Sequence, residues 1–241
     1  MLVNDLKIAI LMANTDESYF ASQHPSDDKH FVDILNNVRS KWIYEVFNVT
    51  HQIFPKSLDN FDGIIITGSP ASANDKDLWV KELLSTVRSS INKKIPIFGS
   101  CFGHQVIAKA LGSKIIKNPD GWSFGLVKTQ VVADASWLEG LEKETLVYAA
   151  HVEQVKDLPT GAKLLFKTDG CDVAGFSIGN NVFTTQYHPE MSRQFMVALT
   201  EELSIKLGKE LTDNALSSLN KNAHTIQFAE AIAKFFERSS A

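Results

Sequence analysis

Short apolar runs rich in β-branched residues recur along the chain and predict strands. In the first half, segments with apolar residues at helical spacing, 31–41 and 78–91, separate these runs. Alternation of strand and helix is typical of a doubly wound parallel sheet. The predicted strands are residues 7–12, 43–49, 63–67, 95–98, 126–132, 146–149, 163–166, 174–178 and 182–186.

The second half has a different pattern. From residue 126 to 186 the predicted strands follow one another through turns rich in Gly, Asp and Asn, which indicates antiparallel pairing. After Met191 the pattern is helical to the end, and Ile226, Ala229, Ala233 and Phe236 share one face of a last helix. We therefore predict an α/β fold with a mixed, mostly parallel central sheet and helices on both faces. We expect a single domain over 1–241, a helical C-terminal extension from about 191 and a surface loop at 14–30.

The composition of the chain argues against some classes of function. Of the 241 residues 44% are hydrophobic and 22% charged, and the formal net charge of −4 gives no basic excess to attract nucleic acid or anionic lipid. The apolar run 8–13 is too short to span a bilayer, and no signal sequence precedes it. Two cysteines do not make a disulfide framework, which favours a reducing compartment. We expect a cytoplasmic protein without nucleic-acid or membrane partners.

Cys101 is the candidate nucleophile. It stands in the motif Gly-Ser-Cys-Phe-Gly, where the predicted strand 95–98 runs into a helix, and Gly99 and Gly103 let strand and helix approach closely. The positive end of the helix dipole favours a thiolate at this position. The free amide of Phe102 could donate to an oxygen that gains charge during acyl transfer, as one half of an oxyanion hole.

The motif Gln-Tyr-His-Pro-Glu at 186–190 supplies a base and a carboxylate. It follows the predicted strand 182–186, so His188 emerges at a strand end, where such a sheet presents its functional loops. Pro189 restricts His188 to an extended conformation, and alternation puts Glu190 on the same side. Glu190 can then orient the imidazole that takes the proton of Cys101.

A third loop leaves the predicted strand 63–67 and begins Gly68-Ser69-Pro70. Gly followed by Ser-Pro makes a sharp turn with exposed backbone amides. The amides of Gly68 or Ser69 could therefore complete the oxyanion hole that Phe102 begins.

Taken together, Gly-Ser-Cys-Phe-Gly-His-Gln at 99–105, the 67–70 loop and Tyr-His-Pro-Glu at 187–190 resemble the class I glutamine amidotransferases. The likeness is greatest to stand-alone members that resemble the amidotransferase domain of GMP synthase. The resemblance implies a flavodoxin-like fold and attack of the Cys101 thiol on the side-chain amide of glutamine. A γ-glutamyl thioester forms, ammonia leaves, and water then frees glutamate.

By the same resemblance His188 is the general acid and base and Glu190 its orienting partner. Gln105 matches a position that contacts the amino-acid end of the substrate. His151 falls in a segment similar to one that borders the glutamine pocket, and Ser123 and Phe124 fall where a substrate-binding loop is expected. His104, the neighbour of the nucleophile motif, is expected to be a packed structural histidine.

Three functions stay open. The first is a glutaminase that passes ammonia to a separate synthetase, since no synthetase domain follows and roughly fifty helical residues close the sequence. The second is a hydrolase of γ-glutamyl peptides or conjugates with the same residues. The third is a redox sensor with Cys101 as an oxidisable thiol, which would have little need of His188 and Glu190.

An α/β-hydrolase is disfavoured because its acid precedes its histidine in the sequence, whereas here the carboxylate follows. No metal-ligand spacing or phosphate-binding glycine fingerprint occurs, so we expect neither metal nor cofactor.

Overall fold

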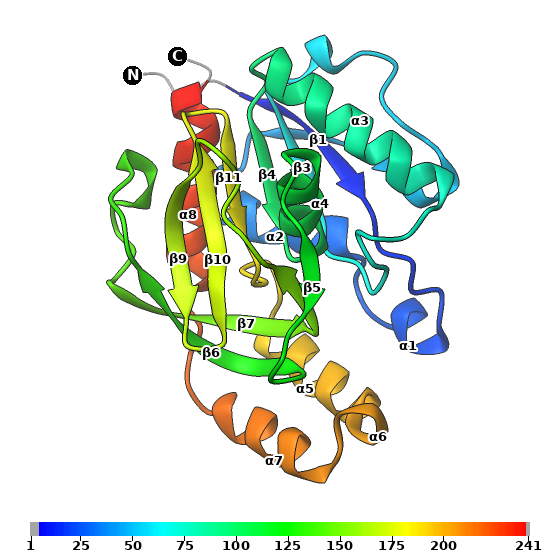
Figure 1. Ribbon diagram of the computed structural model, residues 1–241, viewed down its shortest axis with the longest axis vertical. Helices are drawn as coiled ribbons and strands as arrows, with labels where there is room; N and C mark the ends of the chain where they lie inside the picture. The colour runs from blue at the N-terminus through cyan, green and yellow to red at the C-terminus, as the bar shows by residue number, and fades with distance from the viewer. Residues whose placement is uncertain (1–4, 240–241) are drawn as a thin grey trace.

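The computed structural model describes residues 5–239. A nine-stranded sheet forms its centre, in the order β2-β1-β3-β4-β11-β10-β9-β6-β7 (Figure 1). Its strands are β1 (Lys7–Met12), β2 (Ile43–Asn48), β3 (Gly63–Ile66), β4 (Ile97–Ser100), β6 (Ser123–Val131), β7 (Glu144–His151), β9 (Lys163–Thr168), β10 (Cys171–Ile178) and β11 (Val182–Thr185). A separate pair, β5 (Ile115–Lys117) and β8 (Glu153–Val155), is antiparallel.

The five strands from β2 to β11 are all parallel, whereas β10, β9, β6 and β7 continue the sheet with antiparallel pairs. Strands β3, β4 and β11 are buried throughout, as expected for parallel strands covered on both faces. The predicted α/β fold with a mixed central sheet is therefore confirmed.

Helices cover both faces of the parallel half (Figure 1). Alternate residues of the strands define two cores: Ile8, Ile10 and Ile65 face one, and Ala9, Ile64 and Ile66 face the other. The first core includes residues of α2 (Asp27–Asn36) and α8 (Thr225–Ser239), and the second includes residues of α3 (Leu78–Asn92) and α4 (Phe102–Ala110). The period-2 alternation of the strands thus decides which helix each side chain meets.

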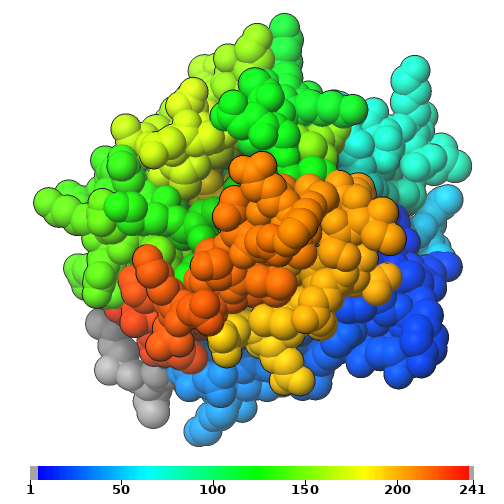
Figure 2. Space-filling view, turned by 90° about the horizontal axis from the view of Figure 1, so that it is seen from below, coloured from blue at the N-terminus to red at the C-terminus, as the bar shows by residue number. Residues whose placement is uncertain are grey.

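Three further helices form a layer against the antiparallel half. They are α5 (Arg193–Glu202), α6 (Ser204–Leu207) and α7 (Lys209–Ser218), and α5 and α7 share an apolar cluster with β6 and β7. Figure 2 shows this gold-to-orange layer crossing one face of the molecule beside the blue N-terminal part. In the described residues no helix combines the length and the apolar character that crossing a bilayer needs.

Some predicted boundaries were wrong. The segment 14–30, expected to be a loop, contains α1 (Tyr19–Ser22) and the first turn of α2, so the helix predicted at 31–41 begins at Asp27 and ends at Asn36. Strand β6 begins at Ser123, which makes that position a strand end rather than a loop. The short strands β5 and β8 were missed because three residues carry too little periodic pattern to be recognised.

Candidate active site

Cys101 occupies a strained corner between β4 and α4. Its backbone has φ 50° and ψ −105°, a conformation that residues with a side chain rarely adopt. Its N–H donates to the carbonyl of Thr185 on β11 (2.9 Å), and its carbonyl accepts the N–H of Gln105 (3.0 Å). The neighbouring strand and the first helical turn therefore hold the corner, and the thiol borders a cavity.

Two glycines make this corner possible through close approach of backbone. A Cβ on Gly99 would lie 2.6 Å from the carbonyl carbon of Gly103, and one on Gly103 would lie 2.4 Å from the carbonyl oxygen of Ile66. Carbon atoms cannot approach backbone that closely. The spacing Gly-x-Cys-x-Gly is thus a steric requirement of packing α4 against β3 and β4.

His188 lies just beyond β11 and is fixed at both its backbone and its ring. Its N–H donates to the carbonyl of Tyr148 on β7 (2.8 Å), and its Nδ1 lies 2.6 Å from Oε1 of Glu190. Glu190 is only 2% exposed and also accepts a hydrogen bond from Oγ of Ser100 (3.2 Å to Oε2). The carboxylate is therefore committed to the imidazole and to one hydroxyl.

The charges around His188 favour its protonated form. Burial by itself lowers the pKa of this imidazole, but the Glu190 carboxylate and the Cys101 thiol beside it raise that pKa well above the usual value. Cys101 and His188 line the same cavity, and a Cβ on Gly68 would lie within 3.8 Å of both side chains, so the thiol and the imidazole lie close together although they are far apart in the sequence. The Nε2 side of the ring is the side left for the thiol, since Nδ1 is engaged by Glu190.

The 67–70 loop packs against both of these groups. A Cβ on Gly68 would lie 2.9 Å from Cε1 of His188 and 3.8 Å from Cβ of Cys101. Gly68 and Ser69 line the same cavity as Cys101. Phe102 is the first residue of α4, so its N–H has no acceptor within the helix. The three candidate oxyanion donors therefore lie around one thiol.

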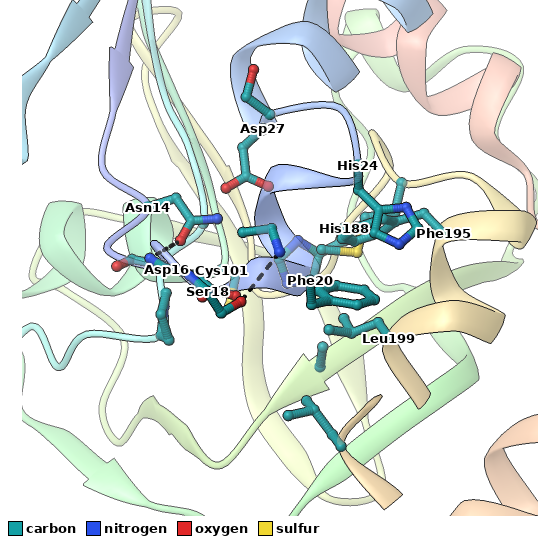
Figure 3. Close-up of a pocket in the computed structure, with 18 of the residues that line it drawn as sticks. Asn14, Asp16, Ser18, Phe20, His24, Asp27, Cys101, His188, Phe195 and Leu199 are labelled. Atoms are coloured by element: carbon teal, nitrogen blue, oxygen red, sulfur yellow. Dashed lines mark hydrogen bonds between the residues drawn. The ribbon is translucent and has the colours of Figure 1, made fainter. Parts of the chain in front are cut away.

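The cavity beside Cys101 has a volume of about 400 Å³, within the range that holds small-molecule ligands (Figure 3). Cys101, His188 and the 68–70 loop form its inner wall. Its outer wall comes from 14–27, including α1, and from Phe195, Leu199 and Leu203 of α5 and its C-cap. The two parts of the outer wall meet through aromatic rings, because Phe195 lies 6.0 Å from Phe20 and 5.5 Å from His24 between ring centroids.

Of the predicted substrate residues, Phe124 lines this cavity, but Gln105, Ser123 and His151 do not. The Gln105 amide instead donates to the carbonyl of Glu153 (2.8 Å) and to Oε1 of Gln186 (3.2 Å). Nδ1 of His151 hydrogen-bonds to the same Glu153 carbonyl (3.1 Å), and Ser123 pairs with His151 across β6 and β7. Gln105 and His151 are buried and Ser123 is half-buried, and all three lie outside the surface of the cavity.

The structure adds three polar residues that the sequence did not indicate. Gln186 donates from Nε2 to Sγ of Cys101 (3.6 Å), Ser100 binds Glu190, and Asp27 lines the cavity. Ser100 and Gln186 stand inside the two motifs already recognised, so their positions could have been noticed. Asp27 lies in a segment without any motif, and no signal in the sequence points to it.

Two further residues have structural environments, and for His104 this was expected. His104 is fully buried, with Nδ1 2.8 Å from Oγ1 of Thr184 and Nε2 3.0 Å from the carbonyl of Val173. Burial lowers its pKa to about 3, so it stays neutral. Cys171 is a free, buried thiol whose pKa burial raises to about 12, which leaves it unreactive.

Comparison with known proteins agrees with this arrangement. The sequence model of the family described as glutamine amidotransferase class-I matches residues 32–198. The chain therefore belongs to the class I glutamine amidotransferase family.

Two relatives differ in the activity that their names give. Gamma-glutamyl peptidase 3 of Arabidopsis thaliana is 29% identical over 223 residues, which are 88% of this chain and 89% of the relative. A subunit of the glutamine-hydrolyzing GMP synthase of Archaeoglobus fulgidus is 32% identical over 148 residues, 60% of this chain and 75% of the relative. A solved glutamine amidotransferase of Thermotoga maritima superposes with a TM-score of 0.77 at 18% identity, covering 98% of this chain and 99% of its own. At this low identity, the likeness to the Thermotoga maritima structure shows a shared fold and nothing more.

Proposed function

We propose that this protein hydrolyses γ-glutamyl amide bonds, the side-chain amide of glutamine included, through a thioester on Cys101. The closeness of the Cys101 thiol to an imidazole bound to the buried Glu190 carboxylate, at the wall of a cavity, carries the proposal. A thiol with no such partner would be a poor nucleophile, since the thiolate is the reactive form. The arrangement fits acyl transfer better than a redox sensor, which needs no acid and base.

In the first half-reaction the Cys101 sulfur attacks the γ-carbonyl carbon and forms the C–S bond. The proton of the thiol passes to Nε2 of His188, and the carbonyl π electrons move to oxygen. When the tetrahedral intermediate collapses, the C–N bond breaks and His188 gives its proton to the leaving nitrogen. Ammonia leaves from glutamine, and an amine or peptide leaves from a larger γ-glutamyl compound.

In the second half-reaction His188 takes a proton from water, and the oxygen of that water attacks the thioester carbon. The C–S bond breaks, the sulfur leaves with the electron pair, and the imidazolium returns its proton to the thiolate. Glutamate leaves with the new carboxyl group. Glu190 stabilises the imidazolium in both halves without taking the proton. The amides of Phe102 and of Gly68 or Ser69 would donate to the oxyanion in both tetrahedral intermediates.

The size of the cavity favours substrates larger than glutamine. A space of about 400 Å³ extends from Cys101 past α1 to α5, more than one free amino acid fills. The name of the Arabidopsis relative, which matches over 89% of its length, points to the same substrate class. We therefore put γ-glutamyl peptides or conjugates first. Glutamine, with ammonia passed to a separate synthetase, is the second candidate, and the relative from the Archaeoglobus GMP synthase supports it.

The test is release of glutamate from glutamine and from a panel of γ-glutamyl peptides, with free ammonia or free amine measured in parallel. We expect turnover of the peptides by the native protein and none by Cys101→Ala, and a γ-glutamyl adduct on Cys101 in the mass spectrum of the acid-quenched enzyme. Full turnover by Cys101→Ala would reject the proposal. Glutamate and ammonia from glutamine alone would favour the synthetase-linked role. A cytoplasmic location stays a prediction.

A further inference from the structure

Asp27 places a carboxyl group in the wall of the cavity that contains Cys101. It is the first residue of α2, it is only 6% exposed, and it lines the cavity together with Cys101 and His188. Figure 3 shows its carboxyl group pointing into the space beside Asn14, away from the turn of α2 that carries it. Burying a carboxyl group costs free energy unless a partner compensates for the lost water. Because the Asp27 carboxyl group faces a ligand cavity and not a structural ion pair, we look for its partner in the ligand.

Asn14 lies beside this carboxyl group (Figure 3). The Oδ1 of Asn14 accepts the backbone N–H of Asp16 (2.7 Å), which fixes the amide plane and turns the NH₂ group away from Asp16. Because Oδ1 is engaged, the NH₂ group is the part of the Asn14 side chain that can donate to Asp27, and the Asn14 amide lowers the pKa of Asp27. A carboxylate offers about four lone-pair directions, and one amide donor occupies only one of them. The Asp27 carboxylate therefore keeps oxygen lone pairs that can accept hydrogen bonds from a ligand in the cavity.

The charges that face Asp27 come from four segments. Burial and the Glu190 carboxylate raise the pKa of Asp27 to about 7, Asp28 adds to the rise, and the His188 imidazole and the Asn14 amide oppose it. Asp16, Glu17 and His24 of the α1 segment line the same cavity, and His30 of α2 lies nearby. Among the described residues that line the cavity, Lys206 of α6 is the only lysine or arginine. The end of the cavity around Asp27 is therefore acidic above neutral pH.

A γ-glutamyl substrate extends in two directions from its scissile amide. The glutamyl group becomes attached to Cys101, and the other side leaves as an amine after protonation by His188. We place the leaving group against Asp27, because Asp27 lines the same cavity as His188, the residue that protonates that group. In a γ-glutamyl amino acid, the residue that carries the scissile nitrogen ends in a carboxylate. In a longer γ-glutamyl peptide, the same residue continues into a neutral amide.

We propose that Asp27, beside Asn14 in the cavity wall, selects γ-glutamyl compounds whose leaving group carries a neutral amide N–H one residue beyond the scissile bond, and disfavours a carboxylate there. The amide N–H donates to the Asp27 carboxylate, whereas a substrate carboxylate at that place meets a like charge. The proposal rests on the proposed γ-glutamyl hydrolase function. It makes Asp27 a specificity residue and leaves the chemistry to Cys101 and His188.

Two substrates that differ at this one group test it: γ-glutamyl-alaninamide and γ-glutamyl-alanine. Near pH 8 we expect kcat/KM of the native enzyme to favour the amide about tenfold or more, since like charges brought together in a poorly solvated site are strongly disfavoured. Near pH 6 Asp27 is protonated and can itself donate to a carboxylate, so the preference should fall toward unity. The substrate carboxyl group, with an ordinary pKa near 3.5, stays ionised across this range.

Asp27→Asn removes the charge with little change in shape, and we expect it to reduce the preference near pH 8 to within about threefold and to abolish its pH dependence. Asp28→Asn is the matched control, because it removes the neighbouring charge of the same helix turn without touching the cavity. Any pH dependence that comes from a group other than Asp27 remains in the Asp27→Asn profile, so this variant separates it from the titration of Asp27.

Three outcomes overturn the inference and leave the proposed hydrolase function intact. The native enzyme could turn over both substrates equally, or Asp27→Asn could keep the native preference. The native enzyme could also prefer the carboxylate, which would point to Lys206. If Asp27→Asn fails to fold, the pH dependence of the native enzyme decides between the same alternatives. If neither substrate nor glutamine is cleaved, the proposed function fails instead, so the two failures are distinguishable.

Discussion

The two walls of the cavity are built in different ways. The inner wall, with Cys101, Gly68 and His188, comes from the ends of β3, β4 and β11, where backbone packs so closely that a single added Cβ would collide. The outer wall comes from 14–27 and from α5, where short helices meet through aromatic rings and several side chains are exposed. The inner wall tolerates little change in shape, and the outer wall tolerates more.

This difference separates the reaction from the choice of substrate. Close packing and buried hydrogen bonds preorganise the groups that act on the scissile amide, as acyl transfer requires. The outer wall touches the parts of a substrate that do not react, so its residues affect binding and selectivity. Variants of the inner wall should therefore lower kcat, and variants of the outer wall should raise KM.

The largest effect is expected for Cys101→Ser. A hydroxyl at this corner is a far weaker nucleophile than the thiolate, and we expect glutamate release to fall by about 10⁴-fold or more. Cys171→Ala removes the other thiol, which lies outside the cavity, and should keep the native rate. Residual activity of Cys101→Ser within tenfold of native would contradict a covalent mechanism.

Glu190→Gln should come next, with a rate about 10²–10⁴-fold lower. Glu190 raises the pKa of His188, so removing its charge lowers that pKa. The imidazolium that protonates the leaving nitrogen is then lost at a lower pH, and the alkaline limb of the kcat profile should move to lower pH. Glu202→Gln, at the exposed end of α5, is the control. An unshifted alkaline limb would show that Glu190 does not act on the pKa of His188.

Gly68→Ala should lower kcat by about 10²-fold, because the new Cβ at 2.9 Å from Cε1 displaces the His188 ring. The ring can move, so we expect the free energy of unfolding to fall by only about 1–2 kcal/mol, measured by urea denaturation. Gly170→Ala is the matched control, since its Cβ would meet only Oδ2 of Asp120 at 3.8 Å. Native kcat in Gly68→Ala would mean that the inner wall is less constrained than its packing indicates.

The smallest effect is expected for Phe195→Ala in the outer wall. Losing the ring contacts with Phe20, His24 and His30 should raise KM for γ-glutamyl peptides about three- to tenfold and leave kcat within about twofold. Ile205→Ala on neighbouring α6 is the control, because that side chain is 98% exposed. A fall in kcat equal to that of Gly68→Ala would remove the distinction between the walls.

The sequence by itself determined the sheet and the inner wall. Strands such as 7–12 and 63–66 carry their own apolar pattern, and the turn around Cys101 and the pair His188 and Glu190 are set by residues next to each other in the chain. Glycine widens and proline restricts the local range of backbone conformations, so their effects can be predicted without knowing what packs nearby.

Tertiary structure decided the outer wall and the environment of the charges. The segment 14–27 has no periodic pattern, and Asp27 acquires its environment from Asn14, Glu190 and His188, which the fold brings together from distant parts of the chain. Likewise, Gln105 was expected at the substrate but hydrogen-bonds to Glu153 and Gln186 beneath the cavity. Burial and through-space electrostatics depend on distances between remote residues, and these exist only once the chain has folded.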